Sequence, residues 1–340
     1  MDKNLPKISY CVFTYNEEKN IEGCLKSIFT QDYPKDKLEV ILVDDGSTDN
    51  TVKIAKNFPV KIFKNGKHDG DLSATIGFQH ASGEFFTAIG ADMRFRGNDW
   101  FLKMVKPLIE NPNMVAAFTK FYSHPKDSLI TKYLNLDPIQ RDLVYQTFSI
   151  GFDKVITEKR DRYYICTYSE NKMPPQTHGL WRVSVLRKII EKQKIYYDMG
   201  NLVGVVRNGY TTFGYVPDAG YFHFHAENIM QLLKKRIRNI QRSYLRYSVK
   251  ETTKSHQYTW IDLTSFKDIV KLFVLIISAN LLLPIFLLSV YKMITKKKWL
   301  YILEAPITVV LVDIILFTFL KEKQGRHMIY ANFKKLLSKI

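Results

Sequence analysis

The chain has 340 residues and a formal net charge of +17, so it can bury a sizeable core in one large domain or two smaller ones. Its three cysteines are widely spaced and odd in number, which argues against a disulfide framework or a cysteine zinc site and fits a reducing compartment. Residues 1–7 contain no apolar stretch, so no cleaved signal peptide is expected.

The charge is unevenly distributed along the chain. From Ala226 onward there are 20 Lys/Arg and 7 Asp/Glu, which places +13 of the +17 in the last third. Such a block predicts a surface for anions, namely lipid headgroups, phosphates or nucleic acid. The same third contains the only long apolar runs, and no nucleic-acid-binding motif is present. The pattern therefore favours a membrane partner over a nucleic acid.

Short apolar runs alternate with amphipathic stretches over the first 122 residues. This order of elements predicts an α/β fold with a parallel, doubly wound sheet whose loops share one edge. The predicted strands are 7–14, 38–43, 60–63, 85–89 and 114–122, and the predicted helices are 21–29, 50–57, 71–81 and 100–111.

The pattern is less regular in the middle of the chain. Residues 123–176 show no clean period, and no element is assigned to them. One helix is predicted over 183–192, and a second helix is predicted to end at residue 207. A strand is predicted over 221–225. A strongly basic helix is predicted over 229–250.

Two long apolar segments follow, 273–291 without charge and 299–320 with Glu304 and Asp313. About 20 apolar residues span a bilayer as a helix, but Asn280 and Pro284 interrupt the first segment, and an acid at mid-membrane costs about 2.5–3.5 kcal/mol. The connecting residues carry four lysines, against the positive-inside tendency of a hairpin with a cytoplasmic catalytic domain. A spanning hairpin is the first interpretation, with interfacial or re-entrant helices and a soluble core as alternatives.

Polar residues follow the first two predicted strands. The second strand ends in Asp44 and Asp45, then Gly46 and a Ser/Thr/Asp-rich stretch. The carboxyl ends of strands are where open α/β sheets bind ligands. Taken alone, the stretch favours a turn followed by a helix N-cap over a ligand site.

Residues 14–18, 43–51 and 81–84, in that order, together resemble the motifs of family 2 glycosyltransferases. The resemblance covers roughly residues 7–95 well and 175–225 loosely. It implies the GT-A fold, a Rossmann-like doubly wound mixed sheet, a nucleotide-sugar donor and inversion at the anomeric carbon. It also implies a nucleotide site formed by Thr14, Tyr15, Asn16, Glu17, Asp44 and Asp45.

The resemblance further implies Mg²⁺ or Mn²⁺ at the donor diphosphate, held by hard oxygen ligands. The family's Asp-x-Asp motif at the end of the fourth strand reads Gly90-Ala91-Asp92 here. Only Asp92, the usual ligand, is kept, which lowers the expected metal affinity; a turn cap is the alternative role for Asp92. Arg94 or Arg96 is expected to neutralise phosphate instead, with Arg94 near the donor phosphate or the acceptor.

Two histidines alternate at 223 and 225, so on a strand both would face one side. In some GT-A enzymes a late histidine completes the metal site, which makes His223 or His225 a candidate ligand. The alternative is a pair of partly buried, hydrogen-bonded histidines.

Inverting sugar transfer needs a general base for the acceptor hydroxyl. The family usually supplies it from a Glu-Asp pair about a dozen residues before a Gly-Tyr. Counting back from Gly209 gives Asp198, preceded by Tyr197 rather than Glu; a helix N-cap is the alternative. His178 is the second choice of base, and Trp181 lies where the family contacts the acceptor.

The expected organisation is a catalytic domain over 1–226, basic interfacial helices over 227–268, two apolar membrane segments over 269–322 and a basic tail over 323–340. The basic helix lacks the Gln-x-x-Arg-Trp of processive synthases, so long-chain polymerisation is not expected.

The expected function is that of a hexosyltransferase at the cytoplasmic face of the cell membrane. Its partners would be a nucleotide-sugar donor, anionic lipid headgroups and an acceptor that is a polyprenyl phosphate or lipid-linked glycan. Two alternatives stay open: a soluble or protein acceptor, and a catalytically silent, membrane-bound nucleotide-sugar-binding scaffold.

Overall fold

The computed structural model describes residues 5–137, 142–170, 172–174, 178–196, 198–241, 245 and 265–337. The chain divides into two compact units. The first unit combines residues 1–122 with 152–224, and the second combines 123–151 with 225–340.

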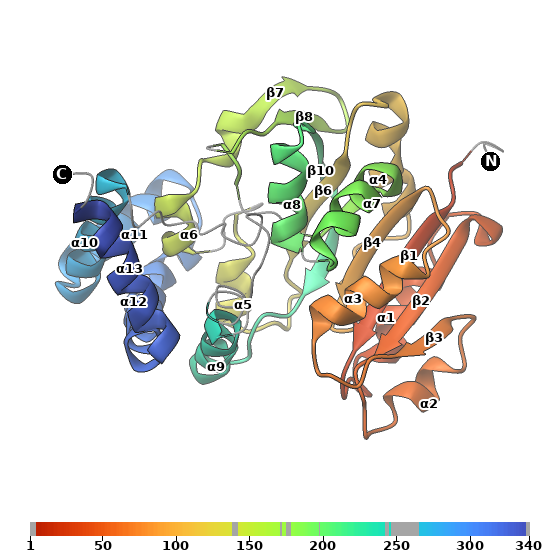
Figure 1. Ribbon diagram of the computed structural model, residues 1–340, viewed down its shortest axis with the longest axis horizontal. Helices are drawn as coiled ribbons and strands as arrows, with labels where there is room; N and C mark the ends of the chain where they lie inside the picture. The colour runs from red at the N-terminus through yellow and green to blue at the C-terminus, as the bar shows by residue number, and fades with distance from the viewer. Residues whose placement is uncertain are drawn as a thin grey trace. The chain divides into compact units, whose positions relative to one another are not determined.

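The first unit is built on a mixed sheet in the order β3-β2-β1-β4-β9-β6-β10-β8-β7, with β5 paired to β10 (Figure 1). Strands β1 to β4 are mutually parallel, and β9 runs antiparallel between β4 and β6. This confirms the predicted α/β class. The strands are β1 Ile8–Thr14, β2 Leu38–Asp44, β3 Lys61–Lys64, β4 Phe85–Gly90, β5 Met93–Phe95, β6 Ala116–Tyr122, β7 Ile156–Lys159, β8 Tyr164–Thr167, β9 Gly179–Arg182 and β10 Thr212–His223.

Alternate residues of β1 face opposite layers of helices, because side chains alternate along a strand. Tyr10 and Val12 belong to the core shared with α1 and α4. Cys11 faces α3, where a Cβ on Gly77 would lie 2.2 Å from its Sγ, so only glycine lets this helix approach the strand. The helices of this unit are α1 Ile21–Phe29, η1 Lys35–Lys37, α2 Thr51–Ala55, α3 Gly70–Gln79, α4 Trp100–Glu110, η2 Phe152–Val155, α7 Val183–Gln193 and α8 Asp198–Arg207.

The second unit is helical in the residues that the structure describes. One apolar cluster joins α5, α9, η5 and α12, and another joins α6, α10, α11 and α12. Its elements are α5 Leu129–Leu134, α6 Leu143–Phe148, α9 Ile229–Asn239, α10 Phe266–Asn280, α11 Leu283–Thr295, η5 Trp299–Leu303, α12 Glu304–Lys321 and α13 Lys323–Leu337.

The segment 123–151 belongs with the C-terminal helices rather than with the sheet. Tyr133 and Leu134 of α5 share a core with Leu232 of α9 and Leu311 of α12. These contacts join residues far apart in sequence, so the local pattern gave no indication of the helices within 123–151. For the same reason the segment was predicted to be part of a catalytic domain over 1–226.

The two apolar segments differ in shape. Trp299–Lys321 is long and apolar enough to cross a membrane, by length and composition only. The segment 273–291 is not one helix: α10 and α11 meet at a 92° bend. The interruptions seen in the sequence, Asn280 and Pro284, flank this break. Of the predicted basic helix, α9 ends at Asn239, and residues 242–244 and 246–250 lie outside the described residues.

Candidate functional site

The carboxyl ends of β1, β2 and β4 meet at one edge of the sheet. Thr14 pairs with Asp44, and Phe13 pairs with Gly90, across parallel ladders. The backbone N–H of Asp45 donates to the carbonyl oxygen of Thr14 at 2.8 Å. The polar residues that end these strands are therefore neighbours, as the parallel order predicted.

The loops after β1 and β2 are joined by hydrogen bonds. The N–H of Asn16 donates to Ser47 Oγ at 2.9 Å, and the N–H of Thr48 donates to Asn16 Oδ1 at 2.8 Å. The N–H of Glu17 donates to Thr51 Oγ1 at 2.7 Å. Asn16 has φ +53°, a left-handed conformation that asparagine tolerates better than most residues. Asn16 and Glu17 thus hold the two loops together, whatever ligand contacts they also make.

Asp44 and Asp45 are both buried, but their carboxylates have different hydrogen-bond partners. Asp44 accepts from the N–H groups of Gly46 at 3.2 Å and Ser47 at 3.1 Å, which stabilises its own turn. Asp45 accepts from Asn65 Nδ2 at 2.7 Å, and burial raises its pKa above the usual value. Asp45 is therefore the member of the pair whose carboxylate accepts a hydrogen bond from outside the turn.

The loop after β3 is a part of this edge that the sequence analysis missed. Asn65 follows β3 and binds Asp45, and its amide also donates to Ser73 Oγ at 3.0 Å. The ring of Tyr15, 46% exposed, contacts His68 at a centroid distance of 4.5 Å. The signal was available, because these residues follow a parallel strand just as the two predicted loops do.

The residues of the expected metal motif follow β4. Oδ1 of Asp92 lies 2.7 Å from the place where a Cβ on Gly90 would stand. A side chain at position 90 would therefore require the carboxylate of Asp92 to shift. Among the residues that the structure describes, no group of three His, Cys, Asp or Glu side chains could hold a metal ion.

His223 lies beside this motif. It ends β10 and pairs with Met93 of β5, the residue after Asp92. Its ring is 4.6 Å from that of Phe121, which also contacts His178 at 6.1 Å. The structure thus pairs His223 with the residue that follows Asp92, and the rings of His223 and His178 both contact Phe121.

His225 does not share a strand with His223, because β10 ends at His223 and His225 belongs to the second unit. The expectation that both rings face one side of a strand is therefore wrong. His225 is buried, with Nε2 2.8 Å from Asn135 Oδ1. This matches the alternative reading of a buried, hydrogen-bonded histidine.

The remaining predicted site residues lie in different parts of the first unit. Arg94 on β5 lies over α1, where a Cβ on Gly23 would be 2.5 Å from its Cζ. Trp181 on β9 is 2% exposed and packs against Phe213, and the acceptor contact expected of it stays a prediction. Asp198 is the first residue of α8, and its side chain lies outside the part of the structure that is described.

Comparison with known proteins gives a consistent picture. Residues 9–172 match the model of glycosyl transferase family 2. Residues of this chain are 40% identical over 91 positions to the dolichyl N-acetyl-alpha-D-glucosaminyl phosphate 3-beta-D-2,3-diacetamido-2,3-dideoxy-beta-D-glucuronosyltransferase of Methanococcus voltae, covering 25% of this chain and 28% of that protein. They are 35% identical over 98 positions to glycosyltransferase AglE of Haloferax volcanii, covering 27% of this chain and 32% of that protein. The chain thus matches less than a third of the length of either relative.

Among solved structures, the chain is similar to the mannosyltransferase PcManGT of Pyrobaculum calidifontis in complex with GDP-Man and Mn²⁺. The TM-score is 0.51 at 18% identity, covering 91% of this chain and 88% of that one. This likeness shows a shared GT-A fold. Together with the motifs that the sheet edge gathers, this match assigns the region over residues 9–172 to glycosyl transferase family 2.

Proposed function

We propose that this protein is an inverting glycosyltransferase that moves one sugar from a UDP- or GDP-linked donor to an acceptor at the cytoplasmic face of the cell membrane. One observation carries the proposal: the carboxyl edge of β1, β2 and β4 gathers Thr14, Asp44, Asp45 and Asp92 in a chain of this family. A nucleotide base needs hydrogen-bonding groups at such an edge.

The donor site is suited to a polar ligand. Oγ1 of Thr14 is buried and has no hydrogen-bond partner among the described residues. Buried polar atoms are nearly always hydrogen-bonded in native proteins, so a polar group of the nucleotide would complete this site. The adjacent carboxylate of Asp45 supplies an acceptor for a base or ribose donor.

Only part of the family's set of ligands for a divalent cation is present here. The residues that the structure describes offer Asp92, with His223 beside it, where the family motif has two acids. We assign Asp92 as the ligand of a Mg²⁺ or Mn²⁺ that would neutralise the donor diphosphate. Weak affinity is expected from the single acid, and the guanidinium of Arg94 adds positive charge two residues further along the chain, on β5.

The chemistry requires one proton transfer by this chain. Asp198 takes the proton from the acceptor hydroxyl as that oxygen attacks the anomeric carbon, and the nucleoside diphosphate leaves. The support for Asp198 is its spacing from Gly209 and its place at the start of α8. His178 is the second candidate.

The acceptor that we favour is a polyprenyl phosphate or lipid-linked glycan. The relative from Methanococcus voltae is named for a dolichyl-phosphate-linked substrate. From Ala226 onward the basic residues outnumber the acidic ones by 20 to 7, which suits anionic headgroups. A soluble or protein acceptor is the second candidate, and the missing first acid at Gly90 keeps a catalytically silent scaffold as the third.

The test combines a donor screen with one substitution. Purified protein is assayed with UDP- and GDP-sugars, lipid extract as acceptor, and with and without EDTA. Asp198→Asn should lower kcat by about 10²–10⁴-fold, because a general base typically contributes that much, while the Kd for the donor stays within about twofold of the wild-type value.

The matched control is Asp161→Asn, at an acid whose side chain is 97% exposed in the same unit. Retained turnover in Asp198→Asn removes the base assignment. Donor binding without turnover on any acceptor favours the scaffold.

A further inference from the structure

The break between α10 and α11 is a sharp apolar turn. Leu282 has φ +61°, a backbone conformation that residues other than glycine rarely adopt. Leu281, Leu282 and Leu283 are 64%, 58% and 63% exposed. At about 1.5 Å per residue, the 15 residues of α10 and the 13 of α11 are each about 20 Å long. Neither helix matches the hydrocarbon core of about 30 Å.

Apolar side chains of both helices face solvent in the structure. Monomeric soluble proteins rarely leave such a surface uncovered. An open groove of about 520 Å³ lies at the same turn, between residues 281–286 and the start of α12, and its lining is apolar. The exposed side chains include Phe273, Val274 and Ile277 of α10 and Phe286, Leu287 and Ile294 of α11, at 47% to 66% exposure.

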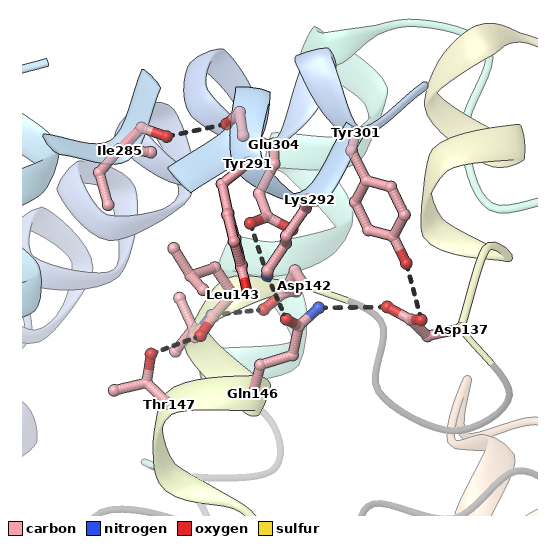
Figure 2. A network of polar contacts seen from close by, with 12 residues as sticks. Asp137, Asp142, Leu143, Gln146, Thr147, Ile285, Tyr291, Lys292, Tyr301 and Glu304 are labelled. Atoms are coloured by element: carbon pink, nitrogen blue, oxygen red, sulfur yellow. Dashed lines mark hydrogen bonds and ion pairs between the residues drawn. The ribbon is translucent and has the colours of Figure 1, made fainter. Parts of the chain in front are cut away.

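The turn between α11 and α12 is tied to the segment 123–151 by a buried polar network (Figure 2). Lys292 Nζ lies 2.6 Å from Glu304 Oε1 and 2.6 Å from Gln146 Oε1 of α6. Glu304 is fully buried. The hydroxyl of Tyr301 donates to Asp137 Oδ1 at 2.9 Å. This end of the helix pair therefore lies beside α5 and α6.

The other end of α12 lies beside the basic helix α9 and its continuation. Gln241 Nε2 donates to Oε1 of Glu322, the residue after α12, at 2.8 Å. Between the two ends, Leu232 of α9 shares a core with Ile307 and Leu311. Both ends of α12 are thus held by polar segments of the same unit.

A spanning α12 is incompatible with these contacts. It would carry either the network around Gln146 or the contact with Gln241 to the far side of the membrane. The basic helix α9 would be carried into the membrane together with these contacts. It contains Lys234, Lys235, Arg236 and Arg238. Each Lys or Arg at mid-membrane costs about 2.5–3.5 kcal/mol on insertion scales.

We infer that α10, α11 and α12 form a one-sided apolar platform that enters a single leaflet of an anionic membrane and does not cross it. The inference rests on the proposed membrane attachment and specifies its geometry. The 281–283 turn inserts deepest. The exposed lysines at 296–298, together with Lys321 and Lys323, meet the headgroups at its rim. Charge and apolar surface together fit a lipid leaflet better than a second copy of this +17 chain.

The sidedness of the 296–298 turn tests this geometry. Cys11, Cys24 and Cys166 are buried, so their background labelling is low. Full-length Lys297→Cys, and Lys56→Cys as reference at an exposed position of the first unit, are added to preformed anionic vesicles. Both are then treated with a membrane-impermeant maleimide.

We expect Lys297→Cys to be labelled on intact vesicles within about twofold of Lys56→Cys, with no gain after detergent. Labelling of Lys297→Cys only after detergent means that the turn has crossed the bilayer, and it overturns the inference. Failure of both variants to float with the vesicles overturns it as well.

The apolar face is tested separately. Phe286→Glu, at a side chain 47% exposed on α11, should weaken vesicle binding by about tenfold or more. The matched control Ile109→Glu, at a side chain 50% exposed on α4, should bind as the wild type does. Unchanged vesicle binding in Phe286→Glu, with a dimer converted to monomer, would assign the face to a second copy instead. Neither measurement involves donor or transfer, so a failure of the proposed enzymatic activity would leave these results readable.

Discussion

Glu39 on β2 shows how one buried carboxylate holds several parts of the sheet together. It is 7% exposed and accepts from Lys61 Nζ at 2.6 Å, Ser9 Oγ at 2.5 Å and the N–H of Ser82 at 2.9 Å. Burial alone raises the pKa of Glu39, but these hydrogen bonds outweigh it and lower the pKa to about 2. A Cβ on Gly83 would lie 2.6 Å from the backbone N of Ser9. The 81–84 motif is therefore a structural turn rather than a ligand site.

Glu39→Gln should destabilise the protein in a pH-dependent way. The folded pKa of about 2 lies below the unfolded value of about 4.3. The carboxylate therefore contributes stability that is present above about pH 4.3 and is lost as the pH falls toward 2. At pH 7 we expect a loss on the order of 2 kcal/mol, measured by urea unfolding at several pH values. A loss that stays constant between pH 7 and pH 3 would contradict the assignment, and Glu22→Gln in an exposed pair is the control.

At the scale of elements, local patterns predicted best where contacts are local. The strand–helix alternation and the gathering of Thr14 with Asp44 follow from parallel strands, whose ends meet at one edge. The contact between Asn65 and Asp45 follows from the same rule, because Asn65 comes directly after the parallel strand β3, although no residue after β3 was predicted to join this edge. The separation of His223 from His225 depends on where β10 ends, which its pairing with β5 sets.

The pair between Lys292 and Glu304 makes a prediction for the helices that it joins. Glu304 is fully buried, so Lys292→Met leaves an uncompensated charge and should lower stability by about 3–5 kcal/mol. The double variant Lys292→Met/Glu304→Met should regain most of this loss, because apolar side chains replace the pair. Thermal unfolding of the four members of this cycle measures the coupling.

The exposed pair of Glu22 and Lys26 is the control for that cycle, with an expected coupling below about 1 kcal/mol. Additive losses in the Lys292 and Glu304 variants would show that the two charges do not depend on each other.

At the scale of the whole molecule, the uneven charge predicts that the proposed membrane attachment depends on salt. The screening length falls from about 10 Å at 0.1 M to about 3 Å at 1 M salt. We expect binding to anionic vesicles to weaken by about tenfold or more over that range, while weaker binding to zwitterionic vesicles, which rests on the apolar platform, stays unchanged. Flotation at both salt concentrations measures this, and salt-independent binding to anionic vesicles would remove the electrostatic contribution.

The linear chain was sufficient for the α/β class, the family resemblance and the gathering of Thr14, Asp44 and Asp45 at one edge of the sheet. Those features depend on the period of apolar residues and on short motifs such as 14–18 and 43–51, which are local in sequence. Three outcomes needed the folded chain: the helices within 123–151, the burial of Trp181 and the tying of both ends of α12 to polar segments. Each depends on contacts between residues far apart in sequence, which no local period records. A run of apolar residues predicts the same helix in a bilayer, at its surface or in a core, and its partners in the fold decide among the three.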